Sequence, residues 1–301
     1  MAVRRAALFI GLLLAGFAGA AAQEPQPGQR AFKSRSDLVV LHVSVIDRKS
    51  GPVAGLTREA FTIYEDGRPQ PIAFFNPEDS PATVGLVIDS SLSMLRQREA
   101  VIAAGLVFAD STNPRDEIFT VHFNENVWLG LPQGQMFTSD RDQLRTALQR
   151  STARGRSAVF DAVAEALMHV EKGTSQKKAL IVISDGGDNS SRRAFADLLA
   201  AAQRSEAIIY TVCLTDEYDR DSDPEVLKQL SQVSGGVAFK PDEVSEVSDV
   251  LRRIARDLHS GYTIGYVPSR SAEATFHNVR VDVSTGNRKL IVRSRSGYAT
   301  N

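Results

Sequence analysis

The sequence predicts an α/β protein: a Rossmann-like, mostly parallel sheet with helices on both faces, plus a small β-sandwich built from the N- and C-terminal segments. Short continuous apolar runs alternate with helical patterns through residues 82–260, as buried parallel strands and their crossover helices do. Residues 36–80 and 261–299 contain strand and turn patterns without helices. The 301 residues, 43% of them hydrophobic, suffice for one large and one smaller core.

The first residues have the pattern of a secretory signal peptide. Two arginines precede the apolar segment Ala6–Phe17, and a run of small residues ends at Ala22. We therefore expect residues 1–22 to be a signal peptide cut after Ala22, and residues 23–35 to be a flexible leader. No later segment reaches the roughly 18 apolar residues of a membrane span. The mature protein is expected to be secreted or periplasmic; an uncleaved N-terminal anchor is the alternative.

Net charge and cysteine content give no sign of a nucleic-acid-binding, membrane-binding or disulfide-bonded protein. The formal net charge of -1 gives no indication of binding to nucleic acid or to an anionic membrane. Cys213 is the single cysteine, so an internal disulfide is impossible, and its apolar surroundings predict an inert buried thiol.

The N-terminal β segment, residues 36–80, begins with an alternating strand over Asp37–Asp47. Two further strands, Phe61–Glu65 and Gln70–Phe74, flank Asp66 and Gly67, a pair typical of a tight hairpin turn. A polar stretch that ends in Pro81 is the expected boundary with the next domain.

The middle domain, residues 82–260, alternates strands and helices. Strands are expected at 84–88, 117–123, 179–183, 207–214 and 237–239, and helices at 95–110, 141–149, 158–171, 194–203, 224–232 and 244–258. Parallel sheets of this kind bind ligands beyond the carboxyl ends of their strands. Polar residues that directly follow an apolar strand are therefore the candidates for a functional site.

The C-terminal β segment, residues 261–299, returns to strands at 262–267, 276–283 and 290–293. Neither terminal segment is large enough to be stable alone. We expect segment 261–299 to pack with segment 36–80 as one β-sandwich.

Three loops carry the candidate site. Asp89, Ser91 and Ser93 follow the first strand of the middle domain, Ser157 precedes a helix, and Asp185 follows another apolar strand. The pattern resembles the metal-ion-dependent adhesion site of von Willebrand factor A domains, whose elements are Asp-x-Ser-x-Ser, a threonine before a helix, and an aspartate after a strand. Ser157 departs from that pattern by lacking the methyl group of threonine.

The terminal segments resemble a secreted bacterial family in which such a domain lies between short β segments. Residues 56–67 and 262–268 carry this second resemblance.

The resemblance implies a Mg²⁺ site, with Mn²⁺ or Ca²⁺ as alternatives. Mg²⁺ prefers oxygen ligands in octahedral geometry and keeps several waters. The three serine hydroxyls would bind it directly, and Asp89 and Asp185 would act largely through bound water. Only two carboxylates surround the ion, so one more anionic oxygen is favoured there. The implied partner is a protein that offers an Asp or Glu carboxylate.

Other polar residues have simpler interpretations. Asp161 is expected to be a helix-start charge or a support for the loop, Asp188 and Asn189 a solvated loop, and Asp216–Asp223 a solvated acidic loop. Ser93 could instead be a helix N-cap, but the capping box is absent because Arg96 stands at its third position. The five histidines are scattered along the chain, and each is expected at the surface or in the core rather than as a metal ligand. They are His42, His122, His169, His259 and His277.

No motif of a serine hydrolase, a P-loop or a dinucleotide-binding fold is present, so we do not expect an enzyme. A metal phosphohydrolase with Asp89 as nucleophile would need a phosphate-binding lysine at the site. A scaffold with a non-functional site is the third interpretation. Arg154 and Arg156 could attract an acidic partner or compete with the metal for Asp185.

Overall fold

The structure is a computed structural model that describes residues 38–77, 79–150, 152–215, 221–268, 276–286 and 289–299. The predicted signal peptide and leader lie outside the described residues, as do residues 216–220 of the acidic run. Over the part of the chain that is described, the structure has no helix with the length and apolar character needed to cross a membrane.

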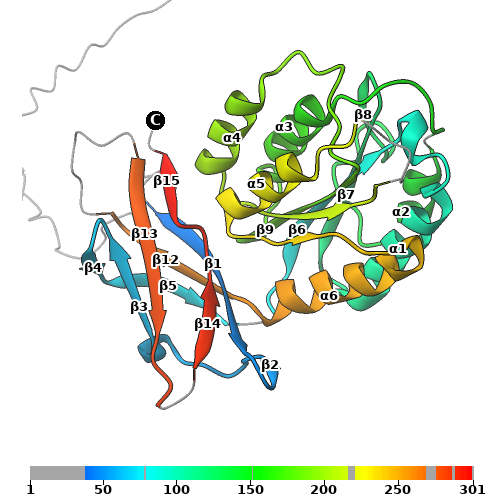
Figure 1. The fold of residues 1–301 in the computed structure, drawn as a ribbon. Coiled ribbons are helices and arrows are strands. Elements are labelled where there is room, and N and C mark those ends of the chain that lie inside the picture. Colours follow the sequence, from blue (N-terminus) through cyan, green and yellow to red (C-terminus); the bar gives the residue numbers. More distant parts are fainter. Residues whose placement is uncertain are drawn as a thin grey trace, which may run out of the picture. The chain divides into compact units, whose positions relative to one another are not determined.

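The middle domain is built on a six-stranded sheet (Figure 1). All neighbouring strands are parallel except β8, which runs antiparallel to β7. β6 and β9 are buried along their whole length, which explains the continuous apolar runs in the middle of their sequences. The spatial order of the strands is β11 (Ala238–Phe239), β10 (Ile208–Cys213), β9 (Lys177–Ser184), β6 (Ala82–Asp89), β7 (Glu117–Phe123) and β8 (Val127–Leu129).

Helices cover both faces of this sheet. One core contains side chains of α1 (Arg98–Ser111), α2 (Arg141–Gln149) and α6 (Val247–Ser260). The opposite core contains side chains of α3 (Val159–Val170), α4 (Phe195–Arg204) and α5 (Pro224–Ser234). Figure 1 shows α1 and α6 on one side of β6 and β9, and α3, α4 and α5 on the other. The predicted α/β class is confirmed.

The order of the strands creates a switch point beside β6. The chain runs from β6 to β7 on one side, and later returns to the other side of β6 as β9. The loops that follow β6 and β9 therefore leave the same edge of the sheet in neighbouring positions. This topology places the two predicted acidic loops together.

Two elements of the middle domain differ from the prediction. The first helix begins at Arg98 rather than near Leu95, because Leu92–Met94 form a short 3₁₀ helix, η3. Strand β8 was not predicted, since Val127–Leu129 is too short a run to carry a clear alternation.

The two terminal segments form a β-sandwich around a third apolar core. One sheet has the order β14 (Leu290–Arg293), β1 (Val39–Asp47), β12 (Tyr262–Tyr266) and β5 (Ile72–Asn76), with β2 (Gly51–Pro52) paired to β1. The other has the order β15 (Gly297–Ala299), β13 (Phe276–Val283), β3 (Phe61–Glu65) and β4 (Arg68–Gln70).

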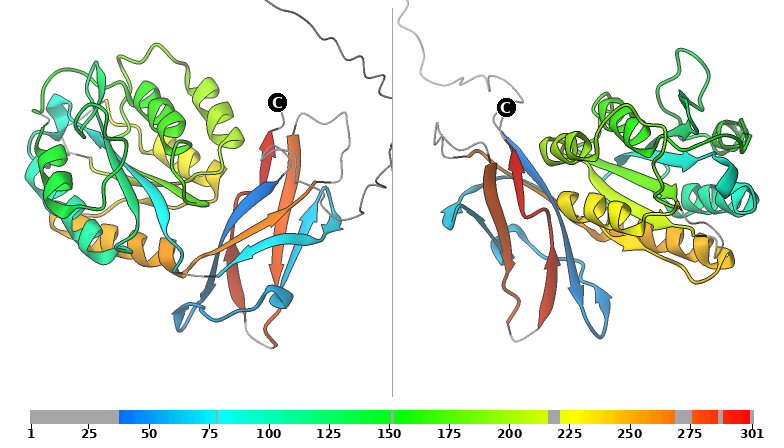
Figure 2. Two further views of the ribbon diagram at one scale, coloured as in Figure 1. Left: turned by 180° about the vertical axis from the view of Figure 1, so that it is seen from behind. Right: turned by 45° about the horizontal axis from the view of Figure 1, so that its top comes forward.

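Each sheet joins the start of the chain to its end. β1 pairs with β12 and β14, and β3 pairs with β13, all antiparallel. In Figure 2 the blue β1 lies beside the red and orange strands of the C-terminal segment. Aromatic rings fill the space between the sheets, with the Phe61 and Tyr262 centroids 4.9 Å apart. The small β-sandwich predicted from the two terminal segments is present.

The predicted single strand Gln70–Phe74 is wrong in detail. β4 pairs with β3 across the turn at Asp66 and Gly67, whose φ values of 48° and 78° are those of a hairpin turn. The chain then changes sheets, and β5 pairs with β12 instead. Pro71 stands between them and has no N–H to continue the ladder.

Candidate metal-binding site at the carboxyl edge of the sheet

The loop after β6 holds three of the five predicted ligands. Asp89, the last residue of β6, is buried, and its Oδ1 accepts the N–H of Ser91 at 2.8 Å. This bond turns the chain directly after the strand. The hydroxyls of Ser91 and Ser93 then lie 3.0 Å apart. Asp89 and Ser91 are 4% and 2% exposed, so the polar groups lie in a largely desolvated place.

The loop after β9 meets this first loop. The Ser93 hydroxyl donates to Asp185 Oδ2 at 2.5 Å, while Asp185 Oδ1 accepts the Gly187 N–H at 2.9 Å. Ser91, Ser93 and Asp185 therefore form a continuous row of side-chain oxygens. The structure thus brings together residues 92 positions apart in the chain.

Ser157 lies on the third loop, just before α3, and is buried. Its N–H donates to Asn189 Oδ1 at 3.0 Å, and its carbonyl accepts the N–H groups of Asn189 and Ser190. The same loop joins the first one through the Leu92 N–H, which donates to the Gly155 carbonyl at 3.1 Å. All three predicted loops are thus joined to one another by hydrogen bonds.

Ser184 is a site residue that the sequence analysis missed. Its hydroxyl donates to Asp89 Oδ2 at 2.7 Å and accepts the Gly186 N–H at 3.0 Å. Ser184 therefore joins the carboxylate at the end of β6 to the turn after β9. Its position directly before Asp185, at the end of an apolar strand, was the available indication.

Gly186 makes the turn after Asp185 possible. Its φ is +85°, and a Cβ at this position would collide with the Asp223 carbonyl. The Asp223 N–H also donates to the Asp185 carbonyl at 3.2 Å. A residue with a side chain would therefore be strained and would displace the segment that precedes α5.

Nearby acidic and amide groups support the loops. Asp161 accepts the N–H groups of Arg192 and Arg193 at 2.9 and 3.2 Å, which confirms its predicted role as a loop support. Asp188 and Asn189 lie in a loop, as predicted, with Asn189 exposed, and both also make hydrogen bonds that support the neighbouring loop. Asp188 Oδ2 accepts the Phe160 N–H at 2.9 Å, and Asn189 binds Ser157.

Ser93 is not a helix cap in the structure. The N-cap of α1 is Gln97, and no side-chain hydrogen bond caps this helix. The Ser93 hydroxyl is used by Ser91 and Asp185 instead. The Ser93 hydroxyl is therefore part of the row of side-chain oxygens at the candidate site.

The two arginines beside Ser157 are exposed. They contribute their backbones to the loop: the Arg154 N–H donates to the Ser90 carbonyl, and the Arg156 N–H to Glu125 Oε2 at 3.1 Å.

Neither Lys177 nor Cys213 contributes a side chain to the candidate metal site. The Lys177 ammonium, at the first residue of β9, donates to the carbonyls of Leu258 and Gly261 at 2.9 and 3.1 Å. Cys213 is buried and not disulfide-bonded, and burial raises the pKa of its thiol to about 11. This agrees with the predicted inert thiol.

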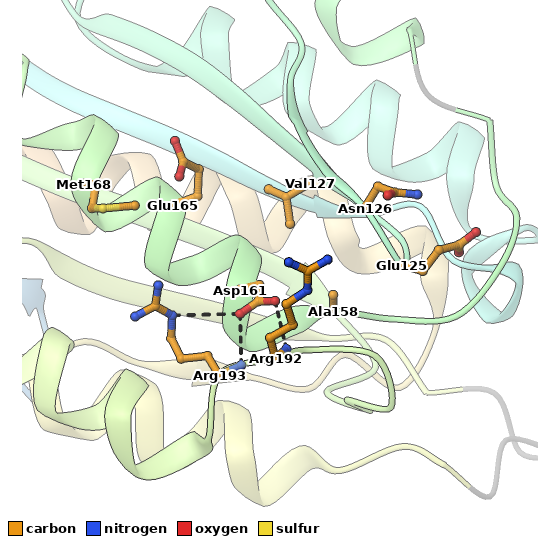
Figure 3. Close-up of a pocket in the computed structure, with 9 residues that line it drawn as sticks. All are labelled: Glu125, Asn126, Val127, Ala158, Asp161, Glu165, Met168, Arg192 and Arg193. Atoms are coloured by element: carbon orange, nitrogen blue, oxygen red, sulfur yellow. Dashed lines mark hydrogen bonds and ion pairs between the residues drawn. The ribbon is translucent and has the colours of Figure 1, made fainter.

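A polar cavity of about 590 Å³ lies beside α3 (Figure 3). It is lined by both acidic and basic groups, and Figure 3 shows Arg193 directed at Asp161. None of the five predicted ligands lines this cavity. The lining residues are Glu125, Asn126, Val127, Ala158, Asp161, Glu165, Met168, Arg192 and Arg193.

Comparison with known proteins agrees with the fold. Residues 84–187 match the family described as von Willebrand factor type A domain. No curated protein is significantly similar in sequence to this chain.

Solved structures give more extended matches. The von Willebrand factor type A protein from Catenulispora acidiphila is 14% identical, with a TM-score of 0.53 over 89% of this chain and 75% of that one. The vWF domain of the type V pili tip protein Mfa5 from Porphyromonas gingivalis is 14% identical, with a TM-score of 0.49 over 58% of this chain and 94% of that one. The PilB minor pilin from Streptococcus sanguinis is 10% identical, with a TM-score of 0.49 over 62% and 63%.

The family match spans the loops after β6 and β9, and the fold of the Catenulispora acidiphila protein extends over most of the described chain. Residues 84–187 of this chain are therefore similar to the von Willebrand factor type A domain.

Proposed function

We propose that this protein is a metal-dependent protein-binding module that holds Mg²⁺ through Asp89, Ser91, Ser93, Ser157 and Asp185. The observation that carries the proposal is the row of oxygens from Ser91 through Ser93 to Asp185, with separations of 3.0 and 2.5 Å. Neighbouring ligands of octahedral Mg²⁺, with bonds of 2.0–2.1 Å, lie about 3 Å apart. The 3.0 Å separation of the two serine hydroxyls and the hard oxygen donors fit this ion, and Mn²⁺ has similar requirements. The shorter separation from Ser93 to Asp185 is that of a hydrogen bond to the carboxylate.

The charge at the site supports capture of a carboxylate. Two buried carboxylates, Asp89 and Asp185, balance one divalent cation, and Ser91, Ser93 and Ser157 add no charge. A bound cation supplies Lewis acidity toward one further anionic oxygen. Asp89 is fixed by Ser91 and Ser184, and Asp185 by Gly187 and Ser93, so these side chains hold the donor set in place. We propose that the partner is a protein with an accessible Asp or Glu side chain.

Two alternatives have weaker support. A metal phosphohydrolase requires a cation that binds phosphate beside Asp89, but Lys177 binds the end of α6 from the opposite end of β9. A scaffold with a non-functional site would not require the hydroxyls of Ser91 and Ser93 to converge on Asp185.

Export from the cytoplasm is a further part of the proposal, based on the sequence of residues 1–22. Expression of the full chain in a bacterium with a periplasm should yield a mature protein outside the cytoplasm that begins at Gln23. N-terminal sequencing and cell fractionation test this. Recovery of an intact N-terminus in the cytoplasmic fraction would refute the proposal.

Calorimetry tests the metal site directly. Mg²⁺ and Mn²⁺ are titrated into the metal-free protein and into Asp89→Ala and Ser93→Ala variants. Asp242→Ala, at an exposed aspartate outside the loops, is the matched control. We expect one site per chain, lost in Asp89→Ala, weakened at least about tenfold in Ser93→Ala, and unchanged in Asp242→Ala. Circular dichroism verifies folding. Equal binding by all four proteins would disprove the metal site.

A further inference from the structure

A second group of metal-ligand side chains lies in the β-sandwich and shares no residue with the loops described above. Glu65 is the last residue of β3, Asp66 begins the following turn, and His277 lies in β13. One ligand atom from each lies within 4.8 Å of the others. We infer that these three residues, the sandwich site, bind a transition-metal dication of the Zn²⁺ type.

The distances fit such an ion. His277 Nδ1 lies 2.7 Å from Asp66 Oδ2 and 3.7 Å from Glu65 Oε1. Ligands of a tetrahedral Zn²⁺, with bonds near 2 Å, are roughly 3.3 Å apart, which falls between these two separations. Small side-chain rotations bring all three atoms to one centre, and the fourth position remains for water.

The backbone fixes two of the three residues. The Asp66 N–H donates to the Asn278 carbonyl at 2.9 Å, and the Asn278 N–H returns a bond to Asp66 Oδ1 at 2.9 Å. Asp66 has a φ of 48°, as its turn requires. β3 and β13 are paired here, with Glu65 opposite Val279. The ligands are therefore positioned by the sheet and not by a long loop.

Buried oxygens around the sandwich site lack partners. Glu65 is 4% exposed and Tyr266 is fully buried, yet Glu65 Oε2 and the Tyr266 hydroxyl have no hydrogen-bond partner within the described part of the chain. A buried carboxylate oxygen without a donor is costly. A cation bound by Glu65 removes that cost and leaves Tyr266 beside the ligand it would orient.

The charges of the two acidic ligands suit a dication. The carboxylates of Glu65 and Asp66 together balance the charge of one such ion. The imidazole nitrogen favours Zn²⁺ over Mg²⁺ and Ca²⁺, whose ligands are oxygens. The sandwich site therefore differs in preference from the oxygen row of the α/β domain.

The sandwich site joins the two ends of the chain. Asp66 and His277 are 211 positions apart; His277 lies in β13, and Asp66 directly follows β3, the strand paired with β13. A bound dication would cross-link the two terminal segments of a small domain, as structural metals do in other small folds. This role is independent of the proposed capture of a partner.

Cobalt binding tests the inference on the full mature chain. The Asp89→Ala background removes the first metal site, so the outcome does not depend on the proposed function. Metal-free protein is titrated with Co²⁺ and then Zn²⁺. We expect one equivalent of Co²⁺ with visible absorption, displacement by Zn²⁺, and a higher melting temperature with Zn²⁺ but not with Mg²⁺.

Variants assign the ligands. His277→Gln and Asp66→Asn should each lower Co²⁺ affinity at least about tenfold. Asp66 is half-exposed, so its variant is expected to fold even where His277→Gln does not. His259→Gln is the matched control, because His259 is also paired with an aspartate, Asp116, at 3.0 Å. Absence of Co²⁺ binding, or equal binding in Asp66→Asn and the control, would overturn the inference.

Discussion

Ser157 is the residue at which the proposed Mg²⁺ site departs from the pattern it resembles. Its backbone N–H and carbonyl fix the loop through Asn189 and Ser190, so changes to its side chain leave these contacts intact. The Ser157 hydroxyl can therefore be removed without breaking the hydrogen bonds that hold the loop. This makes Ser157 the most direct position at which to test ligation.

Substitutions at Ser157 should separate the hydroxyl from the methyl group. Ser157→Ala removes the proposed ligand, and we expect Mg²⁺ affinity to fall at least about tenfold. Ser157→Thr retains the hydroxyl, and we expect affinity within about threefold of the natural protein, since a change of 0.6 kcal/mol is about that factor. Calorimetry measures both. Natural affinity in Ser157→Ala would show that Ser157 is not a ligand.

Cys213 should be unreactive while the protein is folded. Its side chain is buried, and burial raises the pKa of the thiol to about 11, so thiolate is scarce at neutral pH. We expect no modification by a thiol-specific reagent at pH 7.5 over the time in which the denatured chain is fully labelled. Mass spectrometry gives the extent. Rapid labelling of the folded protein would contradict the burial of this strand.

At the scale of elements, the turn after β9 depends on Gly186. Gly186→Ala combines a left-handed φ with a collision against the Asp223 carbonyl. Gly134 is the matched control: its φ is +87°, but nothing lies within 4 Å of the position of a Cβ. We expect Gly134→Ala to cost about 1 kcal/mol and Gly186→Ala clearly more, up to about 3 kcal/mol. Urea unfolding gives both values, and equal costs would refute the role of the collision.

The C-terminal end of α6 depends on Lys177. The buried ammonium donates to two carbonyls at the point where α6 passes into β12. Lys177→Met leaves these carbonyls without that donor, and we expect the free energy of unfolding to fall by about 1–3 kcal/mol. Lys228→Met, at an exposed lysine on α5, should change it by less than about 0.5 kcal/mol. Chemical denaturation that shows no difference between the two variants would refute this role.

At the scale of the whole molecule, two buried histidines should make stability depend on pH. Burial lowers the pKa of His42 to about 3 and that of His122 to about 4, from 6.5. The unfolded chain therefore binds more protons than the folded one as pH falls below 6.5, and folding stability decreases through the window from 6.5 to 4. Each group contributes at most about 1.4 kcal/mol per pH unit.

His122→Gln tests this linkage. The variant cannot gain the proton, so the slope of unfolding free energy against pH between 6.5 and 4 should be smaller by up to about 1.4 kcal/mol per unit. Above pH 7 the slopes of the two proteins should coincide. Denaturation at a series of pH values measures this. An unchanged slope in His122→Gln would mean that His122 binds its proton in the folded state as well.

Much of the fold follows from local sequence. Continuous apolar runs identify β6, β9 and β10, and their alternation with helices predicts the α/β class. Asp66 and Gly67 predict the first hairpin turn. The change of sheet at Pro71 could not be predicted, because the partner of β5 is a strand almost 190 positions later, and pairing at that distance leaves no local pattern.

The sequence by itself determined the α/β fold class and the kinds of side chain in the candidate Mg²⁺ site, because strand periodicity and short motifs are local properties. It placed Asp89, Ser91, Ser93, Ser157 and Asp185 at loops that follow strands or precede a helix. The tertiary structure alone decided which oxygens meet, since Ser93 reaches Asp185 and Ser184 reaches Asp89 only through the pairing of β6 with β9. It also brought Glu65 and Asp66 to His277, because antiparallel pairing of β3 with β13 joins residues that sequence spacing cannot relate.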